Sequence, residues 1–278
     1  MASDKVWFIT GCSTGLGQAL TRAALAAGAK VVATSRKVSD IEHFAKSYPD
    51  TALTLQLDVT NNEQIHAAVD AAQKKFGRID VLVNNAGYGI IGSLEEVPDD
   101  EVRKLFNTNF FGLLNVTRTV LPIMRTQHAG HIINISAAGG VVSTAGLGIF
   151  NASKYAVEGV TEALAQELEP LGIKVTLIEP GPFRTQFAGR SLKKFSGIAD
   201  YDGTRGVIST ALTNYDGKQE GDPDKAAQVI IQIADNPVPP LRLPLGKFAL
   251  ERIHEKLSSF DELLKTWQQV SIDADFKK

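Results

Sequence analysis

The chain has 278 residues, of which 44% are hydrophobic and 22% are charged. These proportions are close to those of ordinary globular proteins, so they exclude a chain that is disordered, collagen-like or coiled coil throughout. The net charge of −2 gives no electrostatic reason to expect a nucleic acid or an anionic membrane as a partner. The single cysteine cannot form an internal disulfide, and the sequence has no signal-peptide pattern and no apolar run of membrane-spanning length. We therefore expect a soluble, cytoplasmic protein.

Short apolar runs alternate along the chain with segments of helical pattern. The runs that predict strands are Val6–Thr10, Val31–Ser35, Leu53–Leu57, Val81–Val83, His131–Ile135 and Val175–Ile178. The segments that predict helices are Gly17–Ala27 and, in round bounds, 62–75, 99–125 and 152–170. Because the strands are apolar throughout and are separated by helices, they predict a parallel sheet with helices on both faces. This is a doubly wound, Rossmann-like α/β fold, and we expect residues 1–278 to form one domain.

The alternation of strands and helices stops after Thr185. Residues 186–222 mix Gly, Ser, Lys, Asp and Tyr without a clear period, which is typical of a functional lid or of a plain surface insertion. We expect this segment to be a substrate-binding loop.

Another helix is predicted over Asp224–Asn236, because Asp222 is a suitable cap and Pro223 suits the first helical position. Residues Pro237–Pro244 predict a proline-rich turn. The C-terminal extension, residues 245–278, contains the amphipathic stretch Phe248–Leu264. Its polar face carries both charge signs, so we expect a helix that is solvated or faces a partner rather than a membrane.

A glycine-rich segment lies directly between the first strand and the first helix. It reads Thr10-Gly11-Cys12-Ser13-Thr14-Gly15-Leu16-Gly17. Glycine permits a tight turn and close approach of the backbone to a diphosphate, and the following helix N-terminus offers unpaired N–H groups. The segment therefore predicts a dinucleotide site. Its spacing differs from the usual fingerprint, and an ordinary strand-to-helix turn is the alternative.

Five motifs occur in an order typical of one enzyme family. They are TGCSTGLG at 10–17, NNAG at 84–87, a serine-containing strand end at 136, NASK at 151–154 and PG at 180–181. Over about residues 5–187, the sequence resembles the classical short-chain dehydrogenases/reductases. The resemblance implies an oxidoreductase that uses a nicotinamide cofactor and no metal to interconvert a ketone or aldehyde and an alcohol.

The resemblance also implies which residues contact the cofactor. Asp58 and Val59 are similar to the family's adenine contact, and Thr185 to the residue that holds the nicotinamide carboxamide. The full set is Gly11, Ser13, Thr14, Gly15, Leu16, Gly17, Ser35, Arg36, Asp58, Val59, Asn85, Ala86, Gly87, Lys154, Pro180, Gly181, Phe183 and Thr185.

The end of the second strand favours NADP(H) over NAD(H). An acidic residue there would bind the ribose hydroxyls of NAD, but the sequence reads Ser35-Arg36-Lys37. Arg36 can form a bidentate pair with the 2′-phosphate of NADP, and we expect Ser35 or Lys37 to assist it. The alternative is that Arg36 and Lys37 are solvated surface cations.

Family members use four catalytic residues. A Tyr supplies the proton, a Lys four positions later lowers the pKa of that Tyr, a Ser steadies the carbonyl oxygen and an Asn supports the Lys. Lys154 and Asn109 match two of these positions. Four residues before Lys154 stands Phe150, which has no hydroxyl and cannot transfer a proton. Tyr155 faces a different side of the helix, so we expect it to be a packing residue.

The serine position is also altered. In the family this residue lies thirteen positions before the Tyr, which corresponds to Ala137 here. Ser136 lies one residue earlier, and neighbouring strand residues point to opposite faces. We therefore place Ala137 in the serine position. Ser136 fills it instead if the loop 138–149 carries one extra residue.

The loss of two hydroxyls, at Phe150 and Ala137, predicts a catalytically impaired enzyme and suggests an engineered, inactivated variant. The alternatives are a natural nucleotide-binding pseudoenzyme and a non-redox isomerase or cyclase on the same scaffold. By family analogy, Gly89–Ile91, Val141–Ile149 and Phe183–Phe195 line the pocket. These segments are largely apolar, so we expect a hydrophobic small-molecule substrate. The resemblance also implies a homodimer or homotetramer formed through helices 99–125 and 152–170.

Overall fold

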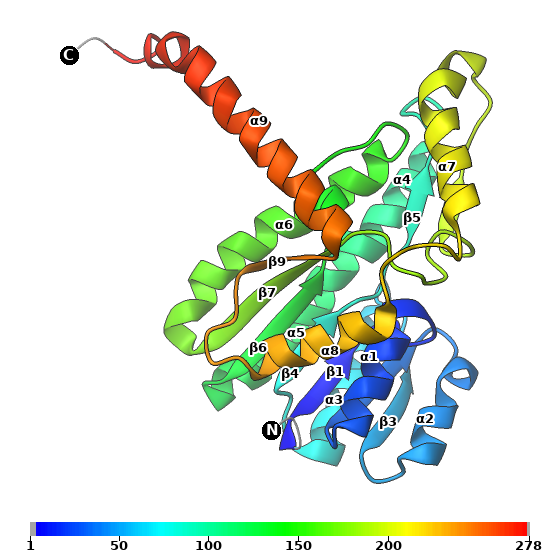
Figure 1. Cartoon of the computed structure of the whole chain (residues 1–278). Coiled ribbons are helices and arrows are strands. Elements are labelled where there is room, and N and C mark those ends of the chain that lie inside the picture. Colours follow the sequence, from blue (N-terminus) through cyan, green and yellow to red (C-terminus); the bar gives the residue numbers. More distant parts are fainter. Residues whose placement is uncertain (1–3, 277–278) are drawn as a thin grey trace.

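Seven parallel strands, in the order β3-β2-β1-β4-β6-β7-β9, form the central sheet of the computed structural model, which describes residues 4–276 (Figure 1). The strands are β1 (Val6–Ile9), β2 (Lys30–Ser35), β3 (Ala52–Gln56), β4 (Val81–Asn84), β6 (Gly130–Ile135), β7 (Ile173–Pro180) and β9 (Arg242–Leu245). The chain starts at β1, runs outward through β2 to β3, and then returns to β4 on the other side of β1. The carboxyl ends of β1 and β4 therefore flank the point where the strand order reverses, which is where such sheets bind ligands.

Helices cover both faces of the sheet, which confirms the predicted doubly wound fold (Figure 1). One face packs against α1 (Gly15–Ala26), α2 (Glu42–Ser47) and α8 (Pro223–Asp235). The other face packs against α3 (Asn62–Phe76), α5 (Leu113–Gln127) and α6 (Gly148–Leu168). Along β1, Trp7 and Ile9 belong to the first core and Phe8 to the second. Both faces of the central strands are thus buried, which is why these strands are apolar throughout, whereas the edge strands β3 and β9 are only partly buried.

The helical stretch predicted over 99–125 is interrupted in the structure. It consists of α4 (Asp99–Phe106), a π-helical turn over Asn107–Gly112, and α5. π-Helical turns are rare and are frequent at functional sites. Here the turn contains Asn109, a predicted site residue.

The segment 186–222 is more regular than its sequence suggests. It contains β8 (Leu192–Lys194), which pairs with β5 (Gly89–Ile91) in a separate two-stranded sheet, and the helix α7 (Val207–Tyr215). The strand β8 has three residues and its partner lies about a hundred positions earlier, so no local pattern could announce it. The bidentate pair of buried Arg205 and Glu96, at 2.8 and 2.9 Å, joins the segment to the body of the protein.

The prediction of a turn over Pro237–Pro244 was wrong at its C-terminal end, because Arg242–Leu245 forms β9 at the edge of the sheet. A proline is tolerated on an edge strand, where its missing N–H breaks no ladder. Arg242 on β9 binds three carboxylates: Glu158 on α6, Glu162 Oε2 at 2.7 Å, and Glu179 Oε1 on β7 at 3.2 Å. These ion pairs join the last strand to α6 and β7.

The final helix, α9 (Lys247–Ile272), contains the predicted amphipathic stretch and extends beyond it. It leaves the body near α6 and projects away from it (Figure 1). Among the helices of residues 4–276, none combines the length and the apolar character needed to cross a membrane.

Replacing Arg242 by Met should destabilise the protein. Glu158 and Glu179 are 4% and 1% exposed, so the change leaves two buried carboxylates without their cation. We expect a loss of about 3 kcal/mol in the free energy of unfolding, at the lower end for broken buried pairs because Arg242 itself is partly solvated. Urea unfolding measures the loss. The control Arg252→Met removes an exposed pair with Glu255 on α9 and should change little; equal effects of the two changes would contradict this account.

Candidate active site

The loop after β1 and the loop after β4 are joined by hydrogen bonds. Thr10 Oγ1 accepts from the backbone N–H groups of Asn85 and Ala86, each at 3.0 Å. The side-chain Nδ2 of Asn85 donates to the carbonyls of Thr10 and Gly11, at 2.9 and 3.0 Å. Two predicted cofactor segments, 10–17 and 84–87, therefore form one rigid unit at the point where the strand order reverses.

The glycines of the first loop occupy positions where a side chain does not fit. Gly11 has φ +74°, and a Cβ there would lie 2.9 Å from the Cα of Ala86. A Cβ on Gly17 would lie 2.4 Å from Asn85 Nδ2. Gly15, the first residue of α1, has φ +60°, a left-handed conformation that favours glycine.

The N-terminus of α1 is open to an anion. Its first turn, Gly15 to Gln18, contains no acidic residue, and Thr14 makes no side-chain capping bond within the described chain. The N–H groups and the positive end of the helix dipole are therefore available. Together with the glycine cradle, this terminus fits the diphosphate of a dinucleotide.

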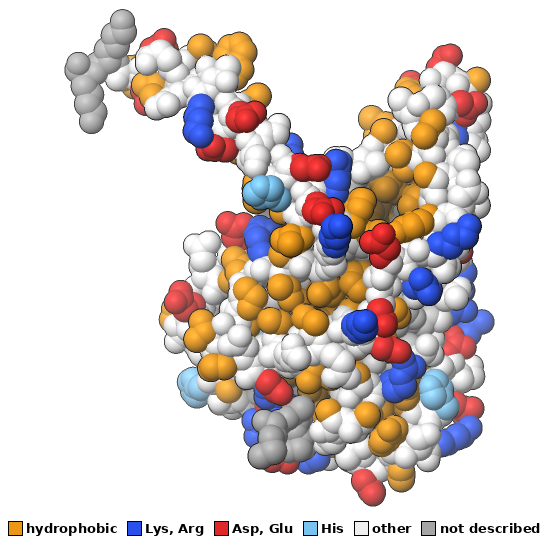
Figure 2. Space-filling view, viewed as in Figure 1, with side chains coloured by type: hydrophobic (Ala, Val, Ile, Leu, Met, Phe, Trp, Pro, Cys, Tyr) orange, Lys and Arg blue, Asp and Glu red, His pale blue; other side chains and the backbone are white. Residues whose placement is uncertain are grey.

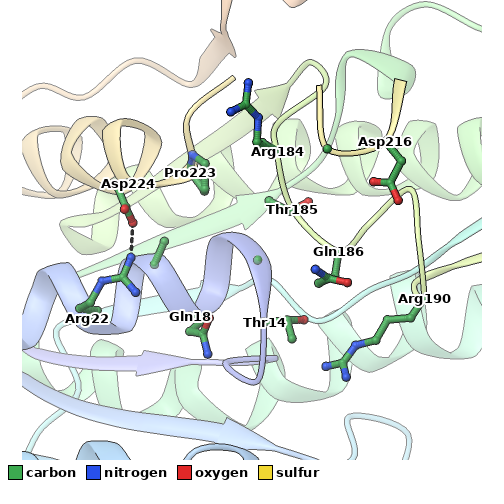
Figure 3. A pocket seen from close by; sticks show the side chains of 13 residues that line it. Thr14, Gln18, Arg22, Arg184, Thr185, Gln186, Arg190, Asp216, Pro223 and Asp224 are labelled. Atoms are coloured by element: carbon green, nitrogen blue, oxygen red, sulfur yellow. Dashed lines mark hydrogen bonds and ion pairs between the residues drawn. The ribbon is translucent and has the colours of Figure 1, made fainter. Parts of the chain in front are cut away.

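A cavity of about 580 Å³ opens beside this helix terminus (Figure 3). Thr14 and Gly15 contribute one wall, and Thr185 and Gln186 from the segment after β7 contribute another. The Thr185 Cβ lies 3.3 Å from an ideal Cβ on Gly15, so this predicted cofactor residue meets the glycine loop. The remaining lining residues, which the sequence did not single out, are Gln18, Ala19, Arg22, Arg184, Arg190, Asp216, Gly217, Pro223 and Asp224.

The polar residues that follow β2 and β3 differ in whether their side chains are free to bind a cofactor. Arg36 is exposed and makes no side-chain hydrogen bond or ion pair with the rest of residues 4–276. Ser35 is buried, and its hydroxyl donates to the carbonyl of Lys37. The carboxylate of Asp58 accepts from the backbone and hydroxyl of Thr60, at 2.9 and 2.7 Å. Of these groups, Arg36 is the one that is free to meet a phosphate.

Lys154 on α6 lies at the centre of the predicted catalytic group. It is 7% exposed, and its Nζ donates to the carbonyl of Ile135 at 2.8 Å. Burial lowers its pKa from 10.5 to about 8, although the carboxylate of Glu158 one turn later raises it. Its ammonium lies 3.9 Å from the position that a Cβ on Gly87 would take. Lys154, on α6, therefore reaches the loop that follows β4 at the carboxyl edge of the sheet.

Asn109 approaches the same loop from the π-helical turn. Its Nδ2 donates to the carbonyl of Tyr88 at 2.9 Å and to Ser153 Oγ at 3.2 Å, and its Oδ1 accepts from Tyr88 N–H at 3.1 Å. The Oδ1 atom also lies 3.1 Å from an ideal Cβ on Gly87. The hydrogen-bond partners of the Asn109 side chain, Tyr88 and Ser153, lie far from it in the sequence. This side chain therefore joins separate segments of the chain instead of bonding to a carbonyl of its own helix.

Phe150 occupies the place one turn before Lys154. Its ring centroid lies 5.9 Å from Lys154 Nζ and 5.5 Å from the ring of Phe187. The ring is buried and brings no hydrogen-bonding group to the site. The hydroxyl of Tyr155, the adjacent tyrosine, donates to the carbonyl of Val141 instead, and its side chain is 42% exposed.

Ser136 faces a buried acidic cluster. An ideal Cβ on Gly140 would lie 2.6 Å from Ser136 Oγ and 2.9 Å from Glu158 Oε1, so the hydroxyl and the carboxylate lie on the same side. Burial raises the pKa of Glu158 to about 7, against the lowering effects of Ser136 and Arg242. Ala137 follows in extended backbone with φ −168°, so its side chain points to the other side.

Sequence reasoning missed this acidic cluster. Glu158 lies four positions after Lys154, a helical spacing that could have drawn attention to it. Arg242 comes from a segment with no strand or helix signal, and nothing in the sequence indicated where it would lie. Phe187 belongs to the segment Phe183–Phe195 that was assigned to the pocket, but its contact with the ring of Phe150 was not predicted.

Comparison with known proteins agrees with this geometry. Residues 5–194 match the sequence profile of the short chain dehydrogenase family. Over 272 residues, 96% of this chain and 98% of the relative, the chain is 38% identical to the oxidoreductase BOA17 of Botryotinia fuckeliana. It is also 38% identical over 243 residues to the 3-ketodihydrosphingosine reductase of Bacteroides thetaiotaomicron, covering 87% of this chain and 88% of that one.

Solved structures share the fold over nearly the whole chain. A short-chain dehydrogenase from Streptomyces avermitilis has a TM-score of 0.93 and 40% identity, covering 99% of this chain and 100% of its own. Two structures at 27% identity and a TM-score of 0.74 hold nicotinamide cofactors. They are a 3-ketoacyl-(acyl-carrier-protein) reductase from Brucella melitensis with NADH, covering 87% of this chain and 97% of its own, and a serine dehydrogenase with NADP+, covering 86% and 93%.

Replacing Lys154 by Met should stabilise the protein when no cofactor is added. Because the pKa of Lys154 falls from 10.5 to about 8 on folding, the unfolded chain holds this proton more tightly. The wild-type chain therefore gains stability as the pH rises from 8 to 10.5. The variant should be the more stable chain at pH 7, by at most about 3 kcal/mol, and this advantage should vanish by about pH 10.5.

Thermal unfolding at several pH values measures this difference. The control Lys247→Met changes a lysine whose side chain is 79% exposed and should show no such pH dependence. A Lys154→Met variant that is less stable than wild type, by the same amount at every pH, would contradict the prediction.

Proposed function

The chain belongs to the short-chain dehydrogenase family, and on this premise we propose that it binds NADP(H) and retains the frame of a reductase for hydrophobic ketones or aldehydes, without the proton donor. The observation that carries the proposal is the arrangement around Lys154. Its ammonium and Asn109 converge on Gly87, while the ring one turn earlier belongs to Phe150. A cofactor-binding lysine is present, and the hydroxyl it would activate is missing.

The cofactor site fits a nicotinamide dinucleotide. The glycine cradle at residues 11–17 and the open terminus of α1 suit the diphosphate. Lys154 suits the ribose hydroxyls, and Thr185 lies against the glycine loop, where it can hold the carboxamide. Arg36, exposed and without an acidic neighbour in the segment 35–37, favours the 2′-phosphate of NADP. Ser35 is a weaker candidate than the sequence suggested, because its hydroxyl donates to Lys37.

When bound, the nicotinamide supplies or accepts the hydride. The chain's residues must then move one proton and stabilise the carbonyl oxygen as it gains negative charge. Lys154 can lower the pKa of a hydroxyl one turn before it, but Phe150 offers none. Loss of a general acid lowers rates about 10²–10⁴-fold, and loss of an oxyanion donor about 10²–10³-fold. The chain as it stands is therefore a weak catalyst.

We assign the serine position to Ala137 rather than to Ser136. Ser136 is 4% exposed and lies beside Glu158, on the side of β6 that faces Arg242 and α6. We infer that a hydroxyl in that place serves the acidic cluster rather than a substrate beside Phe150. Alternation along the extended backbone directs the Ala137 side chain to the opposite side, where a serine hydroxyl would serve the carbonyl.

The proposed substrate is hydrophobic because apolar side chains surround the missing hydroxyl. The ring of Phe187 packs at a tilt against the ring of Phe150, and Phe187 and Leu192 both come within 2.8 Å of an ideal Cβ on Gly89. These residues come from 89–91 and 183–195, two of the three segments assigned to the pocket. The Bacteroides relative is named as a 3-ketodihydrosphingosine reductase, so its named substrate is a keto compound.

The family resemblance also supports a homodimer or homotetramer through α4, α5 and α6. Phe111 at the π-helical turn and Tyr155 on α6 are 50% and 42% exposed, so both rings are accessible to a second copy. A shallow hollow of about 480 Å³ lies between Phe106 and Phe111.

Restoring the two hydroxyls should restore catalysis. We expect Phe150→Tyr to raise turnover about 10²–10⁴-fold. Phe150→Tyr with Ala137→Ser should raise it further. NADPH and NADH oxidation at 340 nm, with a panel of apolar ketones and aldehydes, measures the effect. The matched control is Ser136→Ala in the double variant, which should leave turnover nearly unchanged.

Three results would contradict the proposal. Turnover by the chain as it stands, equal to that of the double variant, would mean that the missing hydroxyls do not matter. Binding of NADPH by both chains with turnover by neither would favour a nucleotide-binding pseudoenzyme. Conversion of a substrate without oxidation of the cofactor would favour an isomerase or cyclase.

Replacing Arg36 by Ser should abolish the preference for NADPH. The change removes one charge-assisted pair, worth about 1.5–3 kcal/mol, so the Kd for NADPH should rise about 10–100-fold. The Kd for NADH should remain within about twofold, which serves as the internal control. Titration of each cofactor, followed by its fluorescence, measures both constants. Equal weakening of both cofactors would show that Arg36 acts on the fold and not on the 2′-phosphate.

A further inference from the structure

The outer part of α9 lies free of the rest of its own chain. Ala249 and Ile253, near the start of the helix, are buried against the body. Every residue from 254 to 272 is exposed, and the helix extends away from the body along this length (Figures 1 and 2). In proteins, most of the stability of a helix comes from the packing of its apolar face rather than from helix propensity. The exposed part of α9 therefore lacks a packing partner within residues 4–276.

The helix α9 carries a regular apolar stripe, which begins near its base and continues along the exposed part. Leu250, Leu257 and Leu264 are seven residues apart, and Ile253, Phe260 and Trp267 follow each of them by three. Except for Ile253, these side chains are 48–60% exposed. Alternating spacings of three and four residues are the pattern of helices that pack along one another, with these residues as the seam. Leu263 and Val270, 52% and 61% exposed, widen the stripe on one side.

The charges of α9 narrow the choice of partner. Residues 247–272 contain four basic side chains (Lys247, Arg252, Lys256, Lys265) and four acidic ones (Glu251, Glu255, Asp261, Glu262). Helices that lie on anionic membranes carry an excess of basic residues on the polar face, which α9 does not have. A balanced helix also has no electrostatic preference for a strongly acidic or basic partner. Two copies of such a helix do not repel each other.

We propose that α9 packs along α9 of a second copy of this chain, in antiparallel orientation, through the stripe of Leu257, Phe260, Leu264 and Trp267. The orientation follows from the base of the helix. Ile253 lies on the same stripe but is buried by its own body, so a partner helix can reach the stripe only beyond this residue. A second helix that enters from the free end covers the stripe without meeting the body. This contact is separate from the proposed α4–α6 interface and does not depend on the proposed activity.

The test is the mass of the full-length protein in solution, measured by light scattering after gel filtration. Leu257→Asp with Leu264→Asp places two charges in the stripe. Ser258→Asp with Gln269→Asp places two charges on the opposite face of the helix. We expect the stripe variant to have half the mass of the wild-type protein and the control variant to keep the wild-type mass. Both variants should bind NADPH as the wild type does, because α9 beyond Ile253 does not contact the cofactor loops.

The orientation has its own test. Cys12 is fully buried, so a cysteine introduced into α9 is the thiol that a spin label will reach. In an antiparallel pair centred on the stripe, Glu262→Cys lies near the middle of the overlap and Gln269→Cys near its end. The distance between the two copies should therefore be clearly longer for the label at 269 than for the label at 262, and both distances should be lost in the stripe variant. Similar distances for the two labels would overturn the antiparallel pair. An unchanged mass of the stripe variant would overturn the proposal itself, as would α9-dependent binding to phosphatidylcholine–phosphatidylserine vesicles by a protein of monomeric mass.

Discussion

The hydrogen bonds between Thr10 and the chain after β4 are the constraint on which the rest of the site depends. They join two loops that follow neighbouring strands at the point where the strand order reverses. Because Asn85 also binds the carbonyls of Thr10 and Gly11, the glycine loop is held open toward the carboxyl edge of the sheet. A larger residue at Gly11 or Gly17 would collide with this second loop. The dinucleotide cradle is thus the product of two strands and not of the glycine motif alone.

Lys154 lowers the stability of the folded chain, since its ammonium is withdrawn from water and paired with one backbone carbonyl. Such a charge is retained in proteins where it has a task, and functional sites often trade stability for it. Asn109, held in place by the π-helical turn, completes the surroundings of Gly87. The frame for activating a hydroxyl is therefore present around a phenylalanine. In the proposed function, this contrast is what separates the chain from family members that present a hydroxyl at this place.

The sheet and its flanking helices could be predicted from the sequence because the central strands are buried on both faces, which leaves a continuous apolar run between helical patterns. The same reasoning singled out the glycine loop, Lys154, Asn109 and Phe150 as site residues, and their roles stay predictions. It failed for β8 and β9, because each is short and is defined by pairing with a strand far away in the sequence. It also missed Arg242 and the contact of Phe187 with Phe150, because these partners become adjacent only in the folded chain. The sequence did not show what surrounds the hydroxyl of Ser136, because Glu158 lies beside it only in the folded chain.

The measurement that tests this account most directly is a crystal structure of the unaltered chain grown with NADPH. The account predicts the diphosphate against residues 11–17, the 2′-phosphate against Arg36, and the ribose within hydrogen-bond distance of Lys154 Nζ. It also predicts that Phe150 alone faces the nicotinamide where family members present a hydroxyl. A cofactor bound elsewhere, or a hydroxyl from Ser136 or Tyr155 turned into the Phe150 site, would contradict the claim that the chain combines a complete cofactor site with a missing proton donor.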